Sequence, residues 1–280
     1  MFPGPTMAAV TFSVITPTMR CGGCHTQCMC PAERNDGAVV ARVAALLAAY
    51  RPGDGALGVS ELARRTGLPK STAHRLTGNL VDAGLLERSG TSLRLGLRLF
   101  EIGQLATGHR DLVDAARPVL ADLRSATRNT VHMARMEGTE VVYFEVLPGP
   151  DAPDLASRVG GRMPAHATGV GKAILAFAGE QALAPVLATG LPRLSTRTIT
   201  SPVILRRQLQ RIREEGVAYE REESGNGTVC VACPILDADG APVAAVSVAG
   251  WSNRMRPERV APAVRAAALT LSRVASAAPS

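Results

Sequence analysis

The chain has 280 residues, 46% of them hydrophobic, which is enough for about two domains with real cores and excludes general disorder. Aromatic residues make up 3%, too few for a stacking platform that binds single-stranded nucleic acid. The formal net charge of +7 permits DNA or an anionic surface as a partner. Residues 1–110 contain 12 Lys and Arg against 7 Asp and Glu, whereas residues 111–280 contain 19 against 17, so a basic module precedes a nearly neutral one.

Residues 1–34 show no sustained hydrophobic period and are expected to form an irregular tail that contains cysteines. The longest uncharged run, residues 1–19, contains three prolines and lacks the cationic start of a secretory signal. We therefore expect a cytoplasmic protein with no membrane partner. In that compartment the six cysteines are expected to be thiols or ligands rather than disulfides.

Four of the cysteines fall within ten residues of this tail, in the run CGGCHTQCMC. Cys21 and Cys24 have the spacing of a zinc knuckle, but Cys28 and Cys30 form a poor second half, because the second pair normally comes from a distant element. CGGCH also matches a haem-attachment motif, whose chemistry requires export. We expect no metal and no other cofactor, and a metal- or redox-sensing regulator that uses these cysteines is the alternative function.

The segment 38–95 has the layout of a winged helix-turn-helix. The expected elements are three helices and a β-hairpin, over 38–50, 60–65, 70–83 and 85–95. Ser60 and Ser71 are expected to cap the second and third helices, and Gly84 to follow the third. The hairpin would form the wing.

Small polar and basic side chains lie near the start of the third helix, the part of a helix-turn-helix that enters the major groove. Ser, Thr and Lys reach phosphates, whereas Arg binds guanine in a bidentate manner. The candidate DNA-binding residues of this helix and of the wing are Lys70, Ser71, Thr72, His74, Arg75, Arg88 and Arg94. The alternative is a three-helix bundle with solvated charges; the wing and the charge asymmetry favour double-stranded DNA as the partner.

The remaining sequence indicates an α/β domain in which strands and helices alternate. The expected helices are 97–107, 112–127, 170–177, 203–215 and 257–275. The expected strands are 129–136, 140–146, 228–236 and 242–249. Cys230 and Cys233 lie three residues apart on one strand, so they are expected on opposite faces of the sheet.

One part of this domain predicts a ligand pocket. Gly169 and Gly171 lie at the start of a helix, where backbone N–H groups and the helix dipole favour an anion. Two of the strands offer small or polar side chains, namely Cys230, Ala232 and Ser247. Small side chains beside a glycine-rich turn leave room for a compact ligand.

An enzyme with Cys230 as nucleophile and His166 as base is an alternative use of the same residues. The sequence shows no pattern of nucleophile, base and orienting group around them, so we expect a binding domain without catalytic residues. Lys172 is expected to pair with a carboxylate or to cover a helix end.

These segments resemble, in the same order, the sequence patterns of IclR-family bacterial transcriptional regulators. The N-terminal pattern is ELARRTGLPKSTAHRLTGNLVDAGLLERSG followed by LRLGLRLFEIGQLA, and the C-terminal patterns are GRMPAHATGVGKAILAF and GVAYEREESGNGTVCVACPILDADGAPVAAVSVAG. The resemblance covers residues 38–273. It implies an α+β fold: a winged helix-turn-helix over 35–96, a linker helix over 97–111 and a GAF-like α/β effector-binding domain over 112–280.

The resemblance also implies a ligand-responsive regulator, repressor or activator, of an operon for small-molecule metabolism. Such regulators are homodimers, often paired into tetramers, on palindromic operators. The implied effector is a carboxylic acid or a related metabolite, and the implied effector-binding residues are Gly169, Val170, Glu220, Cys230, Ala232 and Ser247. Val170 and Glu220 depart from the family pattern, in which a smaller residue and Asp are usual, and both changes alter the volume of the pocket.

Overall fold

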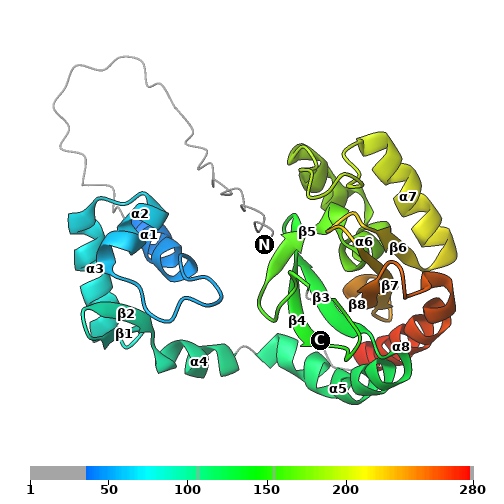
Figure 1. The fold of residues 1–280 in the computed structure, drawn as a ribbon, viewed down its shortest axis with the longest axis horizontal. Coiled ribbons are helices and arrows are strands. Elements are labelled where there is room, and N and C mark those ends of the chain that lie inside the picture. Colours follow the sequence, from blue (N-terminus) through cyan, green and yellow to red (C-terminus); the bar gives the residue numbers. More distant parts are fainter. Residues whose placement is uncertain (1–35, 106, 154, 278–280) are drawn as a thin grey trace. The chain divides into compact units, whose positions relative to one another are not determined.

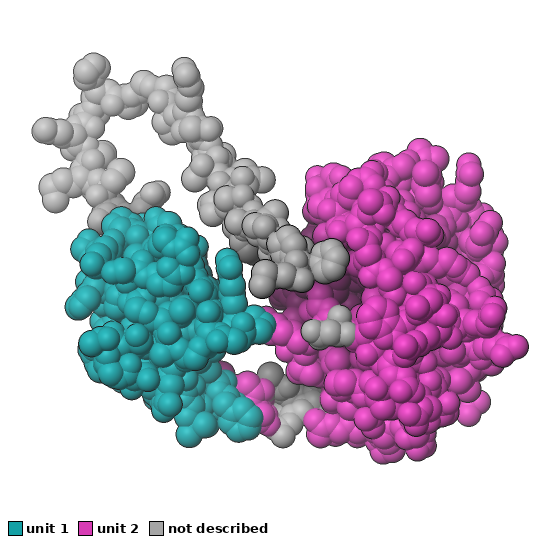
Figure 2. All heavy atoms as spheres, viewed as in Figure 1, with its two compact units in different colours: residues 1–101 teal, residues 102–280 magenta. Residues whose placement is uncertain are grey.

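The computed structural model describes residues 36–105, 107–153 and 155–277. The chain divides into two compact units, residues 1–101 and residues 102–280 (Figure 2). The tail 1–34 lies outside the described residues, and with it the four clustered cysteines on which the metal- or redox-sensing alternative rests.

Unit 1 has the helix-turn-helix and the wing that the sequence predicts (Figure 1). Its elements are α1 (Asp36–Ala48), α2 (Val59–Thr66), α3 (Lys70–Asp82), β1 (Leu86–Ser89) and β2 (Ser92–Leu95). Gly67 ends α2 in the left-handed conformation, with φ at 69°, which a glycine adopts without steric cost. The core is made mainly of leucines from all five elements, Leu46, Leu62, Leu76, Leu80, Leu86 and Leu93.

The predicted N-caps in this unit are wrong, whereas Gly84 follows the C-cap Ala83 of α3 as expected, with φ at 72°. α2 begins at Val59 behind Gly58, and α3 begins at Lys70 behind Pro69, so neither Ser60 nor Ser71 occupies an N-cap position. Pro69 has extended backbone, with ψ at 139°, and the helix starts directly after it. Ser71 therefore lies inside the first turn of α3, where its hydroxyl is exposed rather than used as a cap.

The segment expected to link the two domains, residues 97–111, contains the whole of one helix and the start of another. α4 (Leu97–Gln104) ends earlier than the sequence predicts, and α5 (Thr107–Thr127) begins earlier. α4 has no buried residue, and its apolar side chains Leu97, Phe100 and Ile102 are each more than half exposed. This helix therefore leaves an apolar face unpartnered within the described chain.

Unit 2 is built on a six-stranded antiparallel sheet with the order β5-β4-β3-β8-β7-β6. The strands are β3 (Thr130–Glu137), β4 (Glu140–Leu147), β5 (Arg162–Pro164), β6 (Ala218–Arg221), β7 (Thr228–Leu236) and β8 (Pro242–Trp251). The four longer strands agree with the sequence prediction. β5 and β6 were not expected, because three or four residues are too few to show an alternating pattern.

Helices cover both faces of this sheet (Figure 1). α5 and α8 (Pro257–Ala277) pack on one face, while α6 (Gly169–Ala188) and α7 (Pro202–Glu215) pack on the other. Residues of β7 alternate between the two layers, so that Cys233 belongs to the α5/α8 core and Cys230 faces the α6 side. The prediction that the two cysteines lie on opposite faces is confirmed.

α6 is the one helix in the described chain that is long and apolar enough to cross a membrane by length and composition. Half of its apolar window is buried inside the fold, and its first turns pack against the sheet. The helix also contains the buried Lys172 and a break at Gly179, whose φ is 78°. These features are those of a core helix in a globular domain.

Candidate functional site

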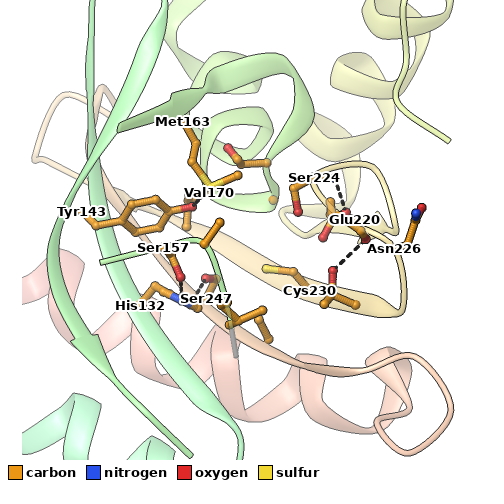
Figure 3. Close-up of a pocket in the computed structure, with 17 residues that line it drawn as sticks. His132, Tyr143, Ser157, Met163, Val170, Glu220, Ser224, Asn226, Cys230 and Ser247 are labelled. Atoms are coloured by element: carbon orange, nitrogen blue, oxygen red, sulfur yellow. Dashed lines mark hydrogen bonds between the residues drawn. The ribbon is translucent and has the colours of Figure 1, made fainter. Parts of the chain in front are cut away.

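A cavity of about 230 Å³ lies on the α6 side of the sheet (Figure 3). Its walls come from the two central strands β3 and β8, from β4, β6 and β7, and from the start of α6. Five of the six effector-binding residues expected from the sequence line it: Gly169, Val170, Glu220, Cys230 and Ser247. Ala232 is fully buried and is not part of the cavity wall. It lies beneath Gly169, because a Cβ added to that glycine would be 3.4 Å from the Ala232 Cβ.

The start of α6 lies on the wall of the cavity, which Thr168, Gly169 and Val170 line. Thr168 is the N-cap, and its Oγ1 accepts a hydrogen bond from the Gly171 N–H at 3.1 Å. Gly169 and Val170, the first two residues of the helix, have N–H groups with no acceptor inside the helix. A Cβ on Gly169 would lie 2.8 Å from the Cys230 Sγ, so the close approach of helix and strand requires glycine here.

A group of three polar residues lies at the His132 side of the cavity, and the sequence prediction found only one of them. The Nε2 of His132 lies 2.8 Å from the Ser157 Oγ, and its Nδ1 lies 3.4 Å from the Ser247 Oγ (Figure 3). Burial lowers the pKa of His132 to about 4, so the imidazole is neutral at pH 7. The group can thus donate and accept hydrogen bonds without contributing charge.

Among the described residues, Glu220 is the one acidic side chain on the cavity wall, and it lies on β6. Its Oε1 accepts hydrogen bonds from the backbone N–H groups of Glu223, at 2.5 Å, and Ser224, at 3.0 Å. Burial raises the pKa of Glu220 to about 7, although Lys172 and the two N–H groups act in the opposite direction.

The expectation that Lys172 pairs with a carboxylate is confirmed. Its Nζ binds both carboxylate oxygens of Glu223 and the carbonyl oxygen of Tyr219, and the lysine is completely buried. The pair connects α6 to the segment after β6, which contributes Ser224, Gly225 and Asn226 to the cavity. None of the described residues that line the cavity is Lys or Arg, so an anionic ligand would be held by N–H and hydroxyl groups.

The residues considered for catalysis are not arranged for it. Burial raises the pKa of the Cys230 thiol to about 12, whereas a nucleophilic cysteine needs a stable thiolate. The Nε2 of His166 lies 3.1 Å from the Pro192 carbonyl oxygen, and that ring nitrogen is used in holding a loop. In the described part of the chain, no group of three or more His, Cys, Asp and Glu side chains is placed to hold a metal ion.

In unit 1 the candidate DNA-binding residues lie on α3 and the wing. Lys70, Ser71, His74 and Arg75 are exposed, and Thr72 is half-buried. The first turn of α3 contains no acidic residue, which leaves the positive end of its dipole free for a phosphate.

The two wing arginines differ in their surroundings. Arg94 forms an ion pair with Glu87 across the hairpin at 2.8 Å, and Glu87 also accepts a hydrogen bond from the Leu97 N–H. Arg88 has no ion pair within the described residues, so its guanidinium is the more available of the two.

Comparison with known proteins gives the same family for both units. The model of the IclR helix-turn-helix domain matches residues 39–90, and the model of the C-terminal domain of the bacterial transcriptional regulator IclR matches residues 104–273. The transcriptional repressor IclR of Escherichia coli (strain K12) is 31% identical over 212 residues, which cover 74% of this chain and 77% of that protein. The regulator XynR of the same organism is 32% identical over 202 residues, 71% of this chain and 80% of XynR.

Solved structures resemble the whole described fold. A crystal structure of an IclR homologue from Microbacterium hydrocarbonoxydans complexed with 4-hydroxybenzoate has a TM-score of 0.78 and 31% identity, and it covers 86% of this chain and 100% of its own. The IclR of Thermotoga maritima has a TM-score of 0.68 and 29% identity, over 86% of this chain and 98% of its own. The predicted α+β fold, with a helix-turn-helix followed by an α/β domain, is confirmed.

Proposed function

We infer that this chain, which belongs to the IclR family of bacterial transcriptional regulators, binds an operator through α3 and the wing. It binds a small effector in the cavity of unit 2. The observation that carries this inference is the set of hydrogen-bonding groups around one cavity. Free N–H groups at the start of α6, the His132 group and Glu220 all lie on its wall. A ligand that favours one arrangement of the dimer would change DNA affinity by shifting the population of states.

The proposed effector is a small monocyclic carboxylic acid. An apolar cavity of about 150 Å³ accommodates benzene, so about 230 Å³ accommodates a ring with polar substituents. Tyr143, Met163 and Val170 provide the apolar part of the wall, and the N–H groups of Gly169 and Val170 would hold the carboxylate. The neighbouring structure that is complexed with 4-hydroxybenzoate supports this class of ligand.

The proposed DNA-binding form is a homodimer on a palindromic operator, which a pair of dimers would extend to a tetramer. The apolar side chains of α4 favour a second copy of this chain as their partner. Leu97 and Phe100 are 64% and 63% exposed, and an exposed apolar patch is typical of an interaction surface. Two copies related by a two-fold axis would present two α3 helices to successive major grooves. We expect this dimer to act in the cytoplasm, on an operon of small-molecule metabolism.

A thermal-shift screen of small carboxylic acids, starting with benzoate and 4-hydroxybenzoate, tests the effector site. We expect an acid that raises the Tm of the wild-type protein and has a smaller effect on Ser247→Ala, because a ligand that binds only the native state stabilises it. The same acid should change the mobility shift of operator DNA. An acid that stabilises both proteins equally would place the effector elsewhere.

Elemental analysis of the purified full-length chain tests the alternative of a metal-sensing regulator. We expect less than about one zinc or iron per chain, since a four-ligand site binds one ion. A stoichiometric metal that is lost when Cys21 and Cys24 are replaced by serine would instead support the alternative.

A further inference from the structure

Glu220 keeps one carboxylate oxygen unused on the cavity wall. The residue is 2% exposed, and both of its hydrogen-bond donors, the N–H groups of Glu223 and Ser224, bind Oε1. Figure 3 shows the bond from Ser224. No described residue donates a hydrogen bond to Oε2. Because Glu220 lines the cavity, Oε2 is the oxygen that is left for a ligand.

Among the described residues, no free positive charge faces this carboxyl group. Lys172 on α6 is the nearby cation, and its three donors are taken by Glu223, at 2.6 and 2.7 Å, and by the Tyr219 carbonyl, at 3.1 Å. The other titratable groups around Glu220 add negative charge or none: Glu223 after β6, Cys230 on β7, Tyr143 on β4 and His132 on β3. Burial without a free counter-ion favours the protonated form, in agreement with the raised pKa of this group.

The start of α6 and Glu220 both adjoin Cys230. Glu220 is paired with Cys230 across β6 and β7, and a Cβ on Gly169 would lie 2.8 Å from the Cys230 Sγ. An anion bound at the N–H groups of Gly169 and Val170 would therefore share a small cavity with the Glu220 carboxyl. Two carboxylates in such a cavity repel each other strongly, so one of them has to hold a proton.

We propose that Glu220 presents the cavity with a neutral carboxylic acid, which donates a hydrogen bond from Oε2 to an anionic effector. The donor role rests on the proposed function, because it requires an effector that carries a negative charge. The pocket then binds the anion and a proton together. It selects monocarboxylates over dicarboxylates, since the part of the cavity wall that the structure describes holds no cation to neutralise a second charge.

The protonation state can be measured in the ligand-free protein. The test follows the side-chain carboxyl carbons of ¹³C-labelled glutamate by NMR from pH 4 to pH 9, and Glu220→Gln assigns the resonance of Glu220. We expect this resonance to titrate at least about two pH units above the usual value for an exposed glutamate. Titration of Glu220 together with the exposed glutamates would overturn the proposal, whether or not any ligand binds.

Binding of benzoate, which stays ionised from pH 6 to pH 9, tests the donor role by calorimetry. We expect the Kd of the wild-type protein to be nearly constant below pH 7 and to rise by about tenfold per pH unit well above it. Glu220→Gln keeps an N–H donor without a titrating proton, so its Kd should stay level across the range. Buffers with different ionisation enthalpies should show uptake of about one proton per benzoate at pH 8 in the wild-type protein alone.

The outcomes separate this proposal from the proposed function. Benzoate binding with a level pH profile in the wild-type protein would overturn the donor role and support the effector site. If neither benzoate nor acetate binds while Glu220 remains protonated at pH 6, the carboxylic-acid effector is wrong and the neutral state of Glu220 is supported.

Discussion

The Nζ of Lys172 lies 2.6 and 2.7 Å from the two carboxylate oxygens of Glu223, and both side chains are buried. The pair joins the first turn of α6 to the segment that follows β6. Ser195 and Thr198 also hold this segment, because the Ser195 hydroxyl donates a hydrogen bond to the backbone carbonyl of Glu222 and the Thr198 hydroxyl donates one to that of Glu223. The wall of the cavity between Glu220 and Thr228 is therefore fixed by contacts that lie outside the cavity.

Removal of one member of this pair should destabilise unit 2. Lys172→Met leaves Glu223 buried without a counter-ion, and we expect a loss of about 3–5 kcal/mol in the free energy of unfolding. Urea unfolding followed by the fluorescence of Trp251, the single tryptophan of the chain, reports on this unit. The double variant Lys172→Met with Glu223→Gln should recover part of the loss.

The exposed ion pair between Arg206 and Glu180 is the matched control. Arg206→Met should leave the urea midpoint within experimental error of the wild-type value, because solvent-exposed pairs contribute little. If Lys172→Met changed the urea midpoint as little as this control, the buried pair could not be the contact that holds the cavity wall.

A methyl group at residue 169 should be tolerated only when the thiol opposite is removed. In Gly169→Ala the new Cβ would lie 2.8 Å from the Cys230 Sγ, and we expect a loss of about 1–3 kcal/mol from overpacking. In Gly169→Ala with Cys230→Ala the closest remaining neighbours are 3.4 and 3.5 Å away, at ordinary contact distance, so most of the loss should be recovered.

Gly103→Ala on α4 is the control for this substitution, since no atom lies within 4 Å of its added Cβ. It should leave the Trp251 transition unchanged. A double variant at Gly169 and Cys230 that is no more stable than the single variant would show that the clash with the thiol is not the cause.

His132 should make the protein sensitive to acid. Its pKa is about 4 in the folded chain and about 6.5 when unfolded, so the unfolded state binds the proton first as the pH falls. The stability that the neutral imidazole contributes is complete above pH 6.5 and is lost between pH 6.5 and pH 4. Between pH 7.5 and pH 4.5 this loss amounts to about 2.5 kcal/mol, and it should be absent in His132→Gln.

The control for the acid sensitivity is His74→Gln, which replaces an exposed histidine of α3. The effect of Glu220 on the pH dependence of stability has the opposite sign to that of His132. Its raised pKa makes the fold less stable as the pH rises from 4.5 to 7, in the wild-type protein and in both variants. Only the difference between the wild-type protein and His132→Gln isolates the imidazole. Equal acid sensitivity of these two proteins would contradict the prediction.

The elements with a long, regular pattern could be predicted from the sequence. β7 and β8 have nine and ten residues with apolar side chains on both faces, and the helix-turn-helix has its turn glycine and its leucine spacing. The pocket residues near Gly169 could be located because a helix start and two strands are local features. The family resemblance then indicated that these residues line the same effector pocket.

Contacts that depend on strand pairing could not be predicted. His132 approaches Ser247 because β3 pairs with β8, although the two residues are 115 positions apart in the chain. Nothing near His132 in the sequence distinguishes it from a histidine on an ordinary strand. Lys172 was expected to meet a carboxylate, but the choice of Glu223, 51 positions away, follows from β6, which is too short to be seen as a pattern.

The apolar face of α4 should hold two copies of the chain together. Phe100→Glu places a charge on a side chain that is 63% exposed in one copy and would be covered in the proposed dimer. We expect a shift toward the monomer in sedimentation equilibrium, with an unchanged Trp251 unfolding transition. Val203→Glu, at an exposed apolar residue of α7, is the matched control. A dimer that forms equally well with Phe100→Glu would place the interface elsewhere.

Arg75 on α3 should set base preference, and Lys70 should set affinity through phosphates. Both are exposed and neither has an ion pair within the described residues. With DNA selected from a random pool by the wild-type protein, we expect Arg75→Ala to weaken binding by about 1–3 kcal/mol and to relax the choice of base at one position. Lys70→Ala should weaken binding to all sequences alike and reduce the slope of log Kd against log salt by about one. Arg207→Ala, on the exposed side of α7, should change neither quantity. An unchanged mobility shift with Arg75→Ala would remove this residue from the DNA interface.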